Sequence, residues 1–403
     1  MADAPKRRVA VVTGTRADYG LLRPTLARLH EDPRFDLRLI VAAMHLDPRH
    51  GNTIGEIEFP VAAELGSGPD DFGDRMAAAL AGFTTALAEL RPDVLLVLGD
   101  RWEVLAAALA ATGLAIPIAH LHGGELSEGS LDDAMRHSVT KLAHLHFVAA
   151  REYGERVVQL GERPDRVHLA GAAGIESIAT LPLLGLEELA GRIGVPLARP
   201  LASLTFHPAS LDAGGAAADA AELAAAVEDV FGAAGTVVVS LPNDDPGSAD
   251  VRAELVALTA RAPNVVAFES LGQLRYLSLL KNADVVVGNS SSGVLEAPWF
   301  RVPVVNVGDR QRGRIAPANV IGAPAERGAI AAALRRALDP AFRDGLADMD
   351  NPFGEGDTSR IVVEALAAAP LAALRDKRFL DLPDGPWRSG LRFATDDPAG
   401  GGS

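Results

Sequence analysis

Short, continuous apolar runs alternate with alanine- and leucine-rich segments of helical period along almost the whole chain. In the first half the runs occupy residues 9–13, 37–43, 94–99, 116–121, 145–149 and 167–170. In the second half they occupy residues 201–206, 237–241, 265–268, 285–288 and 302–307. Strands that are apolar throughout and separated by helices belong to parallel sheets covered on both faces. We therefore predict an α/β fold.

The length of the chain predicts two domains, because 403 residues exceed the usual size of a single core. The alternation of apolar runs and helical segments is interrupted by proline-containing sequence in the stretch from residue 175 to residue 200. We expect two Rossmann-like, doubly wound domains, 1–178 and 196–359, facing each other across a cleft. The helical segment 360–386 is expected to rejoin the first domain, and residues 387–403 to form a disordered tail.

Composition excludes several classes of protein. The formal charge of −15 argues against nonspecific nucleic-acid binding, which depends on clustered lysine and arginine. The absence of cysteine excludes disulfides, thiolate metal sites and a cysteine nucleophile. No apolar 20-residue span is present, and the N-terminal residues lack the apolar region of a secretion signal. We expect a cytoplasmic protein without a membrane partner.

Residues 283–296 combine a buried strand, a Gly/Ser turn and the start of a helix. Free backbone N–H groups and the positive end of a helix dipole form a site for an anion such as phosphate. Ser290 and Ser291 could add hydroxyl donors. Glu296 would repel phosphate but could accept hydrogen bonds from a ribose diol, so the segment favours a nucleotide. The alternative is an ordinary serine N-cap followed by a first-turn glutamate.

Charged residues follow two strands of the first half. Arg16 comes after the first strand and could bind a diphosphate through its guanidinium fork, or could pair with Asp18 on the surface. Asp100 and Arg101 come after the strand at 94–99 and would lie at the mouth of the cleft. Asp100 is a candidate catalytic group, and its alternative role is a helix N-cap.

The densest cluster of chemical groups lies between residues 120 and 137. It contains His122, Glu125, Asp132 and Asp133, and an additional role for the two aspartates is to cap the helix that follows. Five histidines raise the alternative of a metal site: His120, His122, His137, His144 and His146. The carboxylates outnumber plausible ligands, so we expect no metal and favour acid/base chemistry on a neutral sugar beside a phosphate.

The second half supplies further candidate ligands after its strands: His207, Asn243, Arg310 and Arg314. We expect the histidine and the arginines to surround a phosphate at Ser290 and Ser291. Glycine patterns for dinucleotide binding and for a P-loop are missing from the sequence, and Ser292 stands where a nucleophile elbow would need glycine. A serine hydrolase is therefore disfavoured.

Taken together, these segments resemble the UDP-N-acetylglucosamine 2-epimerases, most closely the hydrolysing branch of the sialic-acid pathway. The resemblance runs from residue 8 to about 365 in the right order. It is carried by 15–20 (Thr-Arg-Ala-Asp-Tyr-Gly), 98–101, 122–125 with Asp132, Asp133, Arg136 and His137, 206–208, 242–245, 288–291 with Glu296, 310–314 and 351–356. It implies a glycosyltransferase-B-like fold with UDP between the domains, and neither a metal nor a nicotinamide cofactor.

The resemblance also implies roles for individual residues. Ser290, Ser291, His207 and Arg16 would bind the diphosphate, and Glu296 the ribose. Asp100 and the carboxylates after His122, Glu125 and Asp132 among them, would transfer protons. Arg101, Asp133, Asn243, Arg310 and Arg314 would contact the UDP-sugar. Many relatives carry glutamate where this chain has His122, whereas another bacterial subgroup has histidine, so either His122 or Glu125 takes over the proton transfer.

The expected reaction is anti elimination of UDP to a 2-acetamidoglucal, followed by addition of water to give N-acetylmannosamine and UDP. Alternatives are a non-hydrolysing epimerase that returns UDP-N-acetylmannosamine, and a hydrolysing epimerase of a UDP-2,4-diacetamido-6-deoxy sugar. Two rivals on the same fold are a glycosyltransferase and an inactive UDP-sugar sensor. We expect a homo-oligomer, either a dimer or a tetramer.

Overall fold

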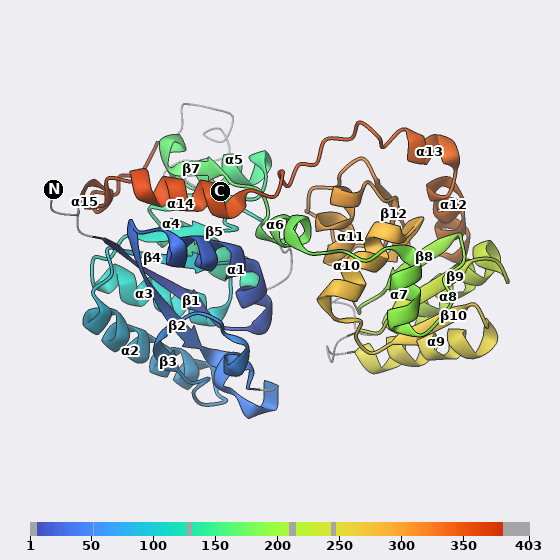
Figure 1. Cartoon of the computed structure of the whole chain (residues 1–403), viewed down its shortest axis with the longest axis horizontal. Helices are drawn as coiled ribbons and strands as arrows, with labels where there is room; N and C mark the ends of the chain where they lie inside the picture. Colours follow the sequence, from blue (N-terminus) through green and yellow to red (C-terminus); the bar gives the residue numbers. More distant parts are fainter. Residues whose placement is uncertain (1–5, 51, 127–130, 209–214, 243–246, 382–403) are drawn as a thin grey trace, which may run out of the picture.

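The computed structural model describes residues 6–50, 52–126, 131–208, 215–242 and 247–381. Within them the chain forms two α/β lobes that lie side by side (Figure 1). The expected tail at 387–403 and the candidate ligand Asn243 lie outside the described residues. The prediction of two doubly wound, parallel-sheet domains is confirmed.

The first lobe is built on a parallel sheet of seven strands in the order β3-β2-β1-β4-β5-β6-β7. Its strands are β1 (Arg7–Thr13), β2 (Phe35–Ala42), β3 (Val61–Leu65), β4 (Val94–Leu98), β5 (Ile118–Leu121), β6 (Leu145–Val148) and β7 (Val167–Leu169). Its helices are α1 (Arg16–Glu31), α2 (Phe72–Leu90), α3 (Trp102–Gly113), α4 (Leu131–Leu142), α5 (Arg151–Gln159) and α6 (Ala173–Thr180), with short 3₁₀ turns η1 (Ala43–Leu46), η2 (Pro48–His50), η3 (Thr53–Glu56) and η4 (Pro164–Arg166).

The second lobe has a parallel sheet of six strands in the order β10-β9-β8-β11-β12-β13. Its strands are β8 (Leu201–Thr205), β9 (Thr236–Ser240), β10 (Val265–Phe268), β11 (Val285–Gly288), β12 (Val304–Val307) and β13 (Val320–Ala323). Its helices are α7 (Leu186–Ile193), α8 (Ala216–Phe231), α9 (Ser248–Arg261), α10 (Gly272–Asn282), α11 (Ser291–Leu295), η5 (Ala297–Phe300), α12 (Arg327–Ala337) and α13 (Pro340–Asp344).

The central strands were predictable because they are mostly apolar and buried. All five residues of β4 and of β8 are buried, and helices cover both faces of each sheet. The strands missed in the sequence, β3 and β13, are edge strands. β3 is half exposed along its length and β13 contains an exposed glycine, so neither shows the continuous apolar pattern.

The end of the chain returns to the first lobe. Helix α14 (Thr358–Ala368), followed by α15 (Leu371–Leu374), lies across the first lobe next to α1 (Figure 1). Ser359 receives a hydrogen bond of 2.6 Å from Arg28 of α1, and Thr358 donates to the carbonyl of Ala170 at 2.9 Å. The domain boundaries expected above stay a prediction, and these contacts agree with a C-terminal helix that rejoins the first lobe.

An apolar cluster is shared by the two lobes. Tyr153 and Ile175 of the first lobe are buried in it together with Leu277 and Ala297 of the second and Phe353 of the segment that returns to the first lobe.

Because parallel strands end at the same edge of a sheet, the loops after β1, β4 and β5 lie close together. Among the described residues, no helix is long and apolar enough to cross a membrane.

Candidate active site

Carboxylates and a buried arginine gather where β4 and β5 end. The two strands are neighbours, and Leu98 pairs with Leu121, so Asp100 and His122 leave the sheet side by side. Helix α4 begins at Leu131 and brings Asp132 and Asp133 in its first turn. Asp100 does not cap α3, because Arg101 occupies the N-cap position and its side chain makes no capping bond. The helix-cap alternative for Asp100 is therefore wrong.

Arg136 of α4 holds this cluster together. Its guanidinium is buried and donates to the carboxylate of Asp100, to the carbonyl oxygen of Glu125 at 3.0 Å and towards Asp133 at 3.5 Å. Burial raises the pKa of Asp100, although the positive charge of Arg136 acts in the opposite direction. The guanidinium presents its donors in a fixed geometry, so a single arginine can set the distance between the carboxylates of Asp100 and Asp133. Arg136 was not predicted as a site residue.

His122 bonds to protein groups through both ring nitrogens. Nε2 accepts a hydrogen bond from the backbone N–H of Ala173 at 3.1 Å, so the proton of the neutral ring resides on Nδ1. Nδ1 lies 2.6 Å from Oε1 of Glu125 and donates to it. Burial raises the pKa of Glu125, but the hydrogen bond from His122 and the positive charge of Arg136 outweigh it, and the net pKa is lowered. The geometry places His122 where it can orient Glu125.

Two charged residues follow β1, Arg16 and Asp18, and they do not form the surface pair that the sequence offered as an alternative. Arg16 is exposed and pairs with Glu56 at 2.9 Å. Asp18 instead faces Arg101, whose guanidinium lies 3.9 Å away and also contacts the buried Glu103. Burial raises the pKa of Asp18 to about 6, with Arg101 lowering it and the negative charges of Glu103 and Asp100 adding to it. Asp18 thus belongs to the Asp100 cluster, and sequence patterns did not single it out.

In the second lobe the expected nucleotide segment forms a very short helix. Ser290 caps α11, which has only five residues. A helix this short has only a small dipole, so the serine hydroxyls would be the main groups that bind an anion here. Ser292 donates to the carboxylate of Glu296, and burial raises the pKa of that carboxyl. Glu296 follows the end of α11, so the first-turn alternative is wrong. Tyr276 faces Ser292 and Ser290, and burial raises its pKa to about 12.

An asparagine links the strand ends around this segment. The side-chain amide of Asn289 accepts from the backbone N–H of His207 at 2.7 Å and donates to its carbonyl at 2.8 Å. The backbone carbonyl of Asn289 in turn accepts from Arg310 at 3.0 Å and from Gln311 at 2.8 Å. The ends of β8, β11 and β12 are therefore tied together, and His207, Ser290 and Arg310 lie in one region.

The loop after β12 also reaches the first lobe. The positive charge of Arg314 acts to lower the pKa of Glu125, so this arginine lies within electrostatic range of the first-lobe carboxylates. The backbone of the next residue, Ile315, forms a hydrogen bond with the hydroxyl of Tyr153, whose pKa burial raises to about 12. Cationic groups from one lobe and acidic groups from the other are thus adjacent.

Among the described residues, no group of three or more histidine, aspartate and glutamate side chains is arranged to hold a metal ion. Most of the predicted site residues fall into two groups. The first-lobe group contains Asp100, Arg101, His122, Glu125, Asp132 and Asp133, and the second-lobe group contains His207, Ser290, Ser291, Glu296 and Arg310. Arg314 connects the groups, whereas the contact recorded for Arg16 is with Glu56.

Comparison with known proteins shows which sequences this chain is similar to. A family model described as UDP-N-acetylglucosamine 2-epimerase matches residues 27–367. The UDP-N,N'-diacetylbacillosamine 2-epimerase (hydrolyzing) of Legionella pneumophila is 35% identical over 374 residues, which cover 91% of this chain and 97% of that protein. The UDP-N-acetylglucosamine 2-epimerase of Neisseria meningitidis is 34% identical over 388 residues, which cover 93% of this chain and 99% of that protein.

Solved structures show the same fold. A Neisseria meningitidis UDP-GlcNAc 2-epimerase bound to UDP-GlcNAc superimposes with a TM-score of 0.76 at 19% identity, over 89% of this chain and 99% of that one. A Listeria monocytogenes protein described as a putative UDP-N-acetylglucosamine 2-epimerase gives a TM-score of 0.77 at 18% identity, over 94% and 100%. These likenesses support the glycosyltransferase-B-like arrangement expected from the sequence.

Proposed function

The chain belongs to the UDP-N-acetylglucosamine 2-epimerase family, and from that premise we propose that it is a hydrolysing 2-epimerase. Its substrate is a UDP-linked 2-acetamido sugar, and its products are UDP and the free sugar with the opposite configuration at C2. UDP-N-acetylglucosamine is the first candidate substrate and would give N-acetylmannosamine.

The observation that carries the proposal is that the loop after β12 reaches the first lobe, where the backbone of Ile315 bonds to Tyr153 and the charge of Arg314 acts on Glu125. We expect a pyrophosphate beside Ser290 and Arg310 to bring its sugar ring against the acidic groups around Arg136. Leaving-group stabilisation and proton transfer need this proximity, because they act on adjacent carbon atoms of the same ring. A glycosyltransferase would need the nucleotide site but not the ordered carboxylates opposite it.

The first step is elimination. The bond between C1 and the phosphate oxygen breaks, its electron pair leaves with UDP, and a base removes the proton from C2, so that a C1=C2 double bond forms. The C2 proton is not next to a carbonyl, and departure of UDP provides the driving force for its loss. Donors that stabilise the developing diphosphate charge are each worth up to about 3 kcal/mol in the transition state.

The second step is addition of water to the glucal. A proton is delivered to C2 from the opposite face, and hydroxide from water adds at C1, which releases the free sugar. We assign the two proton transfers to members of the group Asp100, Glu125 and Asp132. Asp100 accepts from Arg136, the charge of Arg136 acts on the carboxylate of Glu125, and Asp132 lies in the first turn of α4, where its charge acts on Asp100. His122 orients Glu125, because both of its ring nitrogens already have protein partners.

A second candidate substrate is a UDP-2,4-diacetamido-6-deoxy sugar. Two relatives favour it: the Legionella protein already described, and a Campylobacter jejuni GDP/UDP-N,N'-diacetylbacillosamine 2-epimerase (hydrolyzing) that is 33% identical over 324 residues. The Neisseria relative favours UDP-N-acetylglucosamine at nearly the same identity. The two substrates differ at C4 and C6, and the chemistry at C1 and C2 is the same.

Proton NMR in D₂O with each UDP-sugar tests the proposal. We expect free sugar of manno configuration, stoichiometric UDP and one deuterium at C2. UDP-N-acetylmannosamine as the lasting product would show a non-hydrolysing epimerase. Transfer without deuterium at C2 would show a glycosyltransferase, and tight UDP binding without turnover of any UDP-sugar would show a sensor. Each of these three outcomes overturns the proposal.

A further inference from the structure

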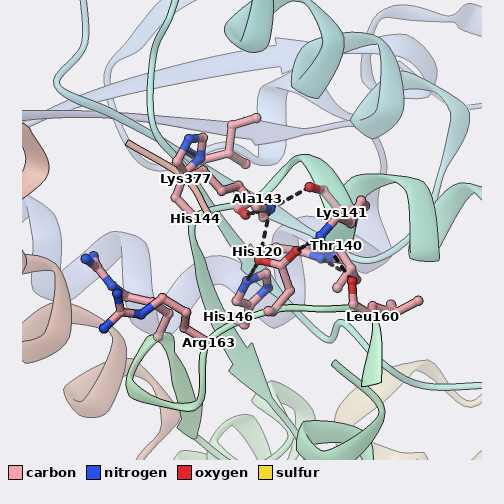
Figure 2. Close-up of polar contacts among 12 residues, drawn as sticks. His120, Thr140, Lys141, Ala143, His144, His146, Leu160, Arg163 and Lys377 are labelled. Atoms are coloured by element: carbon pink, nitrogen blue, oxygen red, sulfur yellow. Dashed lines mark hydrogen bonds and ion pairs between the residues drawn. The ribbon is translucent and has the colours of Figure 1, made fainter. Parts of the chain in front are cut away.

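A buried carboxylate lies on the side of the first lobe where the C-terminal segment docks. Glu162 receives hydrogen bonds from Lys141 at 2.7 Å and from Lys377 at 2.9 Å, and its other contact is with Nε2 of His146 at 3.2 Å (Figure 2). Burial acts to raise the pKa of Glu162, but these donors outweigh it and lower the pKa to about 2. The carboxylate is therefore ionised and firmly held.

Lys377 also caps a helix. Its ammonium group donates to the backbone carbonyls of Lys141 and Ala143, at the C-terminal end of α4 (Figure 2). Carbonyls at a helix end have no partner within the helix, and a cation there also matches the helix dipole. One side chain from the returning segment thus bonds both to Glu162 and to the end of α4.

The residues next to Lys377 hold it in place. Phe379 packs under Lys141, whose ammonium lies 4.4 Å from the ring centre, and the backbone N–H of Leu380 donates to Gly161 at 2.8 Å. A Cβ atom at Gly161 would lie 2.4 Å from the ring of Phe379, so this position requires glycine while the ring is docked. The segment from Lys377 to Leu380 is therefore fixed to the first lobe by these contacts, although Phe379 itself is largely exposed.

The last turn of α4 is joined to the candidate active site through a histidine. Thr140 of α4 lies 3.2 Å from Nδ1 of His120, and Nε2 of His120 lies 2.7 Å from the carbonyl oxygen of Gly99. Asp100 is the next residue after Gly99. Burial lowers the pKa of His120 to about 3, so the ring is neutral and can donate from Nε2 to this carbonyl.

The other end of α4 carries the acidic pair and Arg136. A helix of 12 residues is about 18 Å long and moves largely as one body, so a shift at its C-terminal end also moves its first turns. We propose that Lys377 is a positioning residue for the reaction, which holds α4 where Arg136 and Asp132 meet Asp100. The C-terminal segment thereby becomes part of the catalytic arrangement without touching substrate. This inference rests on the proposed function.

Kinetics of Lys377→Met test this role, with Arg378→Met as the matched control. Arg378 is the next residue, is exposed and pairs with Asp376. Arg378→Met therefore removes one positive charge, as Lys377→Met does, but it removes no contact with α4. We expect kcat of Lys377→Met to fall about tenfold or more while KM changes less than twofold, and Arg378→Met to match the wild type. Unchanged kcat in Lys377→Met, or an equal loss in Arg378→Met, would overturn the proposal.

Loss of folding is separated from loss of positioning by a double variant. Lys377→Met with Glu162→Gln also removes the buried carboxylate charge that Lys377 no longer helps to balance, and the double variant should unfold near the temperature of the wild type. Its kcat should stay low, since the cap on α4 is still missing. Recovery of full kcat together with stability would show that Lys377 only stabilises the fold, and would overturn the proposal.

Backbone hydrogen exchange of residues 131–142 provides a readout that does not depend on activity. Exchange at 135–142, where the N–H groups bond within the helix, should rise in Lys377→Met and remain at the wild-type level in Arg378→Met. A wild-type protein that turns over no UDP-sugar would refute the proposed function while this exchange difference persists. Normal exchange at 135–142 in Lys377→Met would refute the positioning role even in an active enzyme.

Discussion

Nδ1 of His122 lies 2.6 Å from Oε1 of Glu125, and the opposite ring nitrogen of His122 accepts the backbone N–H of Ala173. Of the two alternatives that the sequence left open, this arrangement favours proton transfer by Glu125, because a histidine with both nitrogens engaged can orient its carboxylate partner. His122 also has a backbone φ of 64°, in the left-handed region. Asparagine tolerates this region better than most residues.

His122→Asn should therefore fold and remain active. We expect kcat to fall by up to about 100-fold, because Glu125 loses its fixed orientation. The acidic and basic limbs of the pH profile of kcat/KM should fall at the same pH values as in the wild type, since the groups that transfer protons are still present. Steady-state kinetics between pH 5 and 9 provide the measurement. Disappearance of one limb would mean that His122 itself transfers the proton.

Asp100→Asn should remove one of the proton-transfer groups. The amide retains an oxygen that can accept from Arg136, so folding and UDP binding should be close to normal. We expect kcat to fall by about 100- to 10,000-fold, the usual contribution of a general acid or base. The rate of UDP release measures this loss. The control is Asp165→Asn, a change at an exposed residue. Near-normal kcat would remove Asp100 from the mechanism.

Glu296→Gln should weaken nucleotide binding. A hydrogen bond to a charged group contributes about 1.5 to 3 kcal/mol, so affinity for UDP should fall about 10- to 100-fold if the carboxylate receives the ribose diol. Titration calorimetry with UDP provides the measurement. The matched control is Glu269→Gln, an exposed glutamate of the same lobe that pairs with Arg252. Equal UDP affinity in the two variants would refute the ribose assignment.

Asp18→Asn should stabilise the protein at neutral pH. Burial raises the pKa of Asp18 from its ordinary 3.8 to about 6, so the folded state favours the protonated carboxyl. Its contribution to stability is present below pH 3.8 and is lost as the pH rises through 6, which costs up to about 3 kcal/mol at pH 7.5. The amide avoids this cost, and Tm should rise.

Calorimetry at pH 7.5 and at pH 4.5 measures the effect of Asp18→Asn. The gain in Tm should shrink strongly at the lower pH, where the wild-type carboxyl is itself protonated in the folded state. Asp376→Asn, at an exposed position, should change Tm little at either pH. A gain of equal size at both pH values would show that the buried charge of Asp18 is not its cause.

The central strands, the helices between them and the use of two parallel sheets could be predicted from the sequence because they depend on local periodicity. Residues after a strand were also predictable as site candidates, since all strands of a parallel sheet end at one edge. This reasoning found Asp100, His122 and Ser290. It missed the edge strand β3, because half-exposed strands lack a continuous apolar pattern.

Only the tertiary structure decided which of these groups meet. Arg136 bonds to Asp100 across 36 positions of sequence, and Lys377 reaches the end of α4 across 236. No local pattern specifies such contacts, because they depend on the packing of helices and on the path by which the chain returns to its first lobe. The sequence determined which chemical groups are available at the strand ends, and packing determined their partners and therefore their roles.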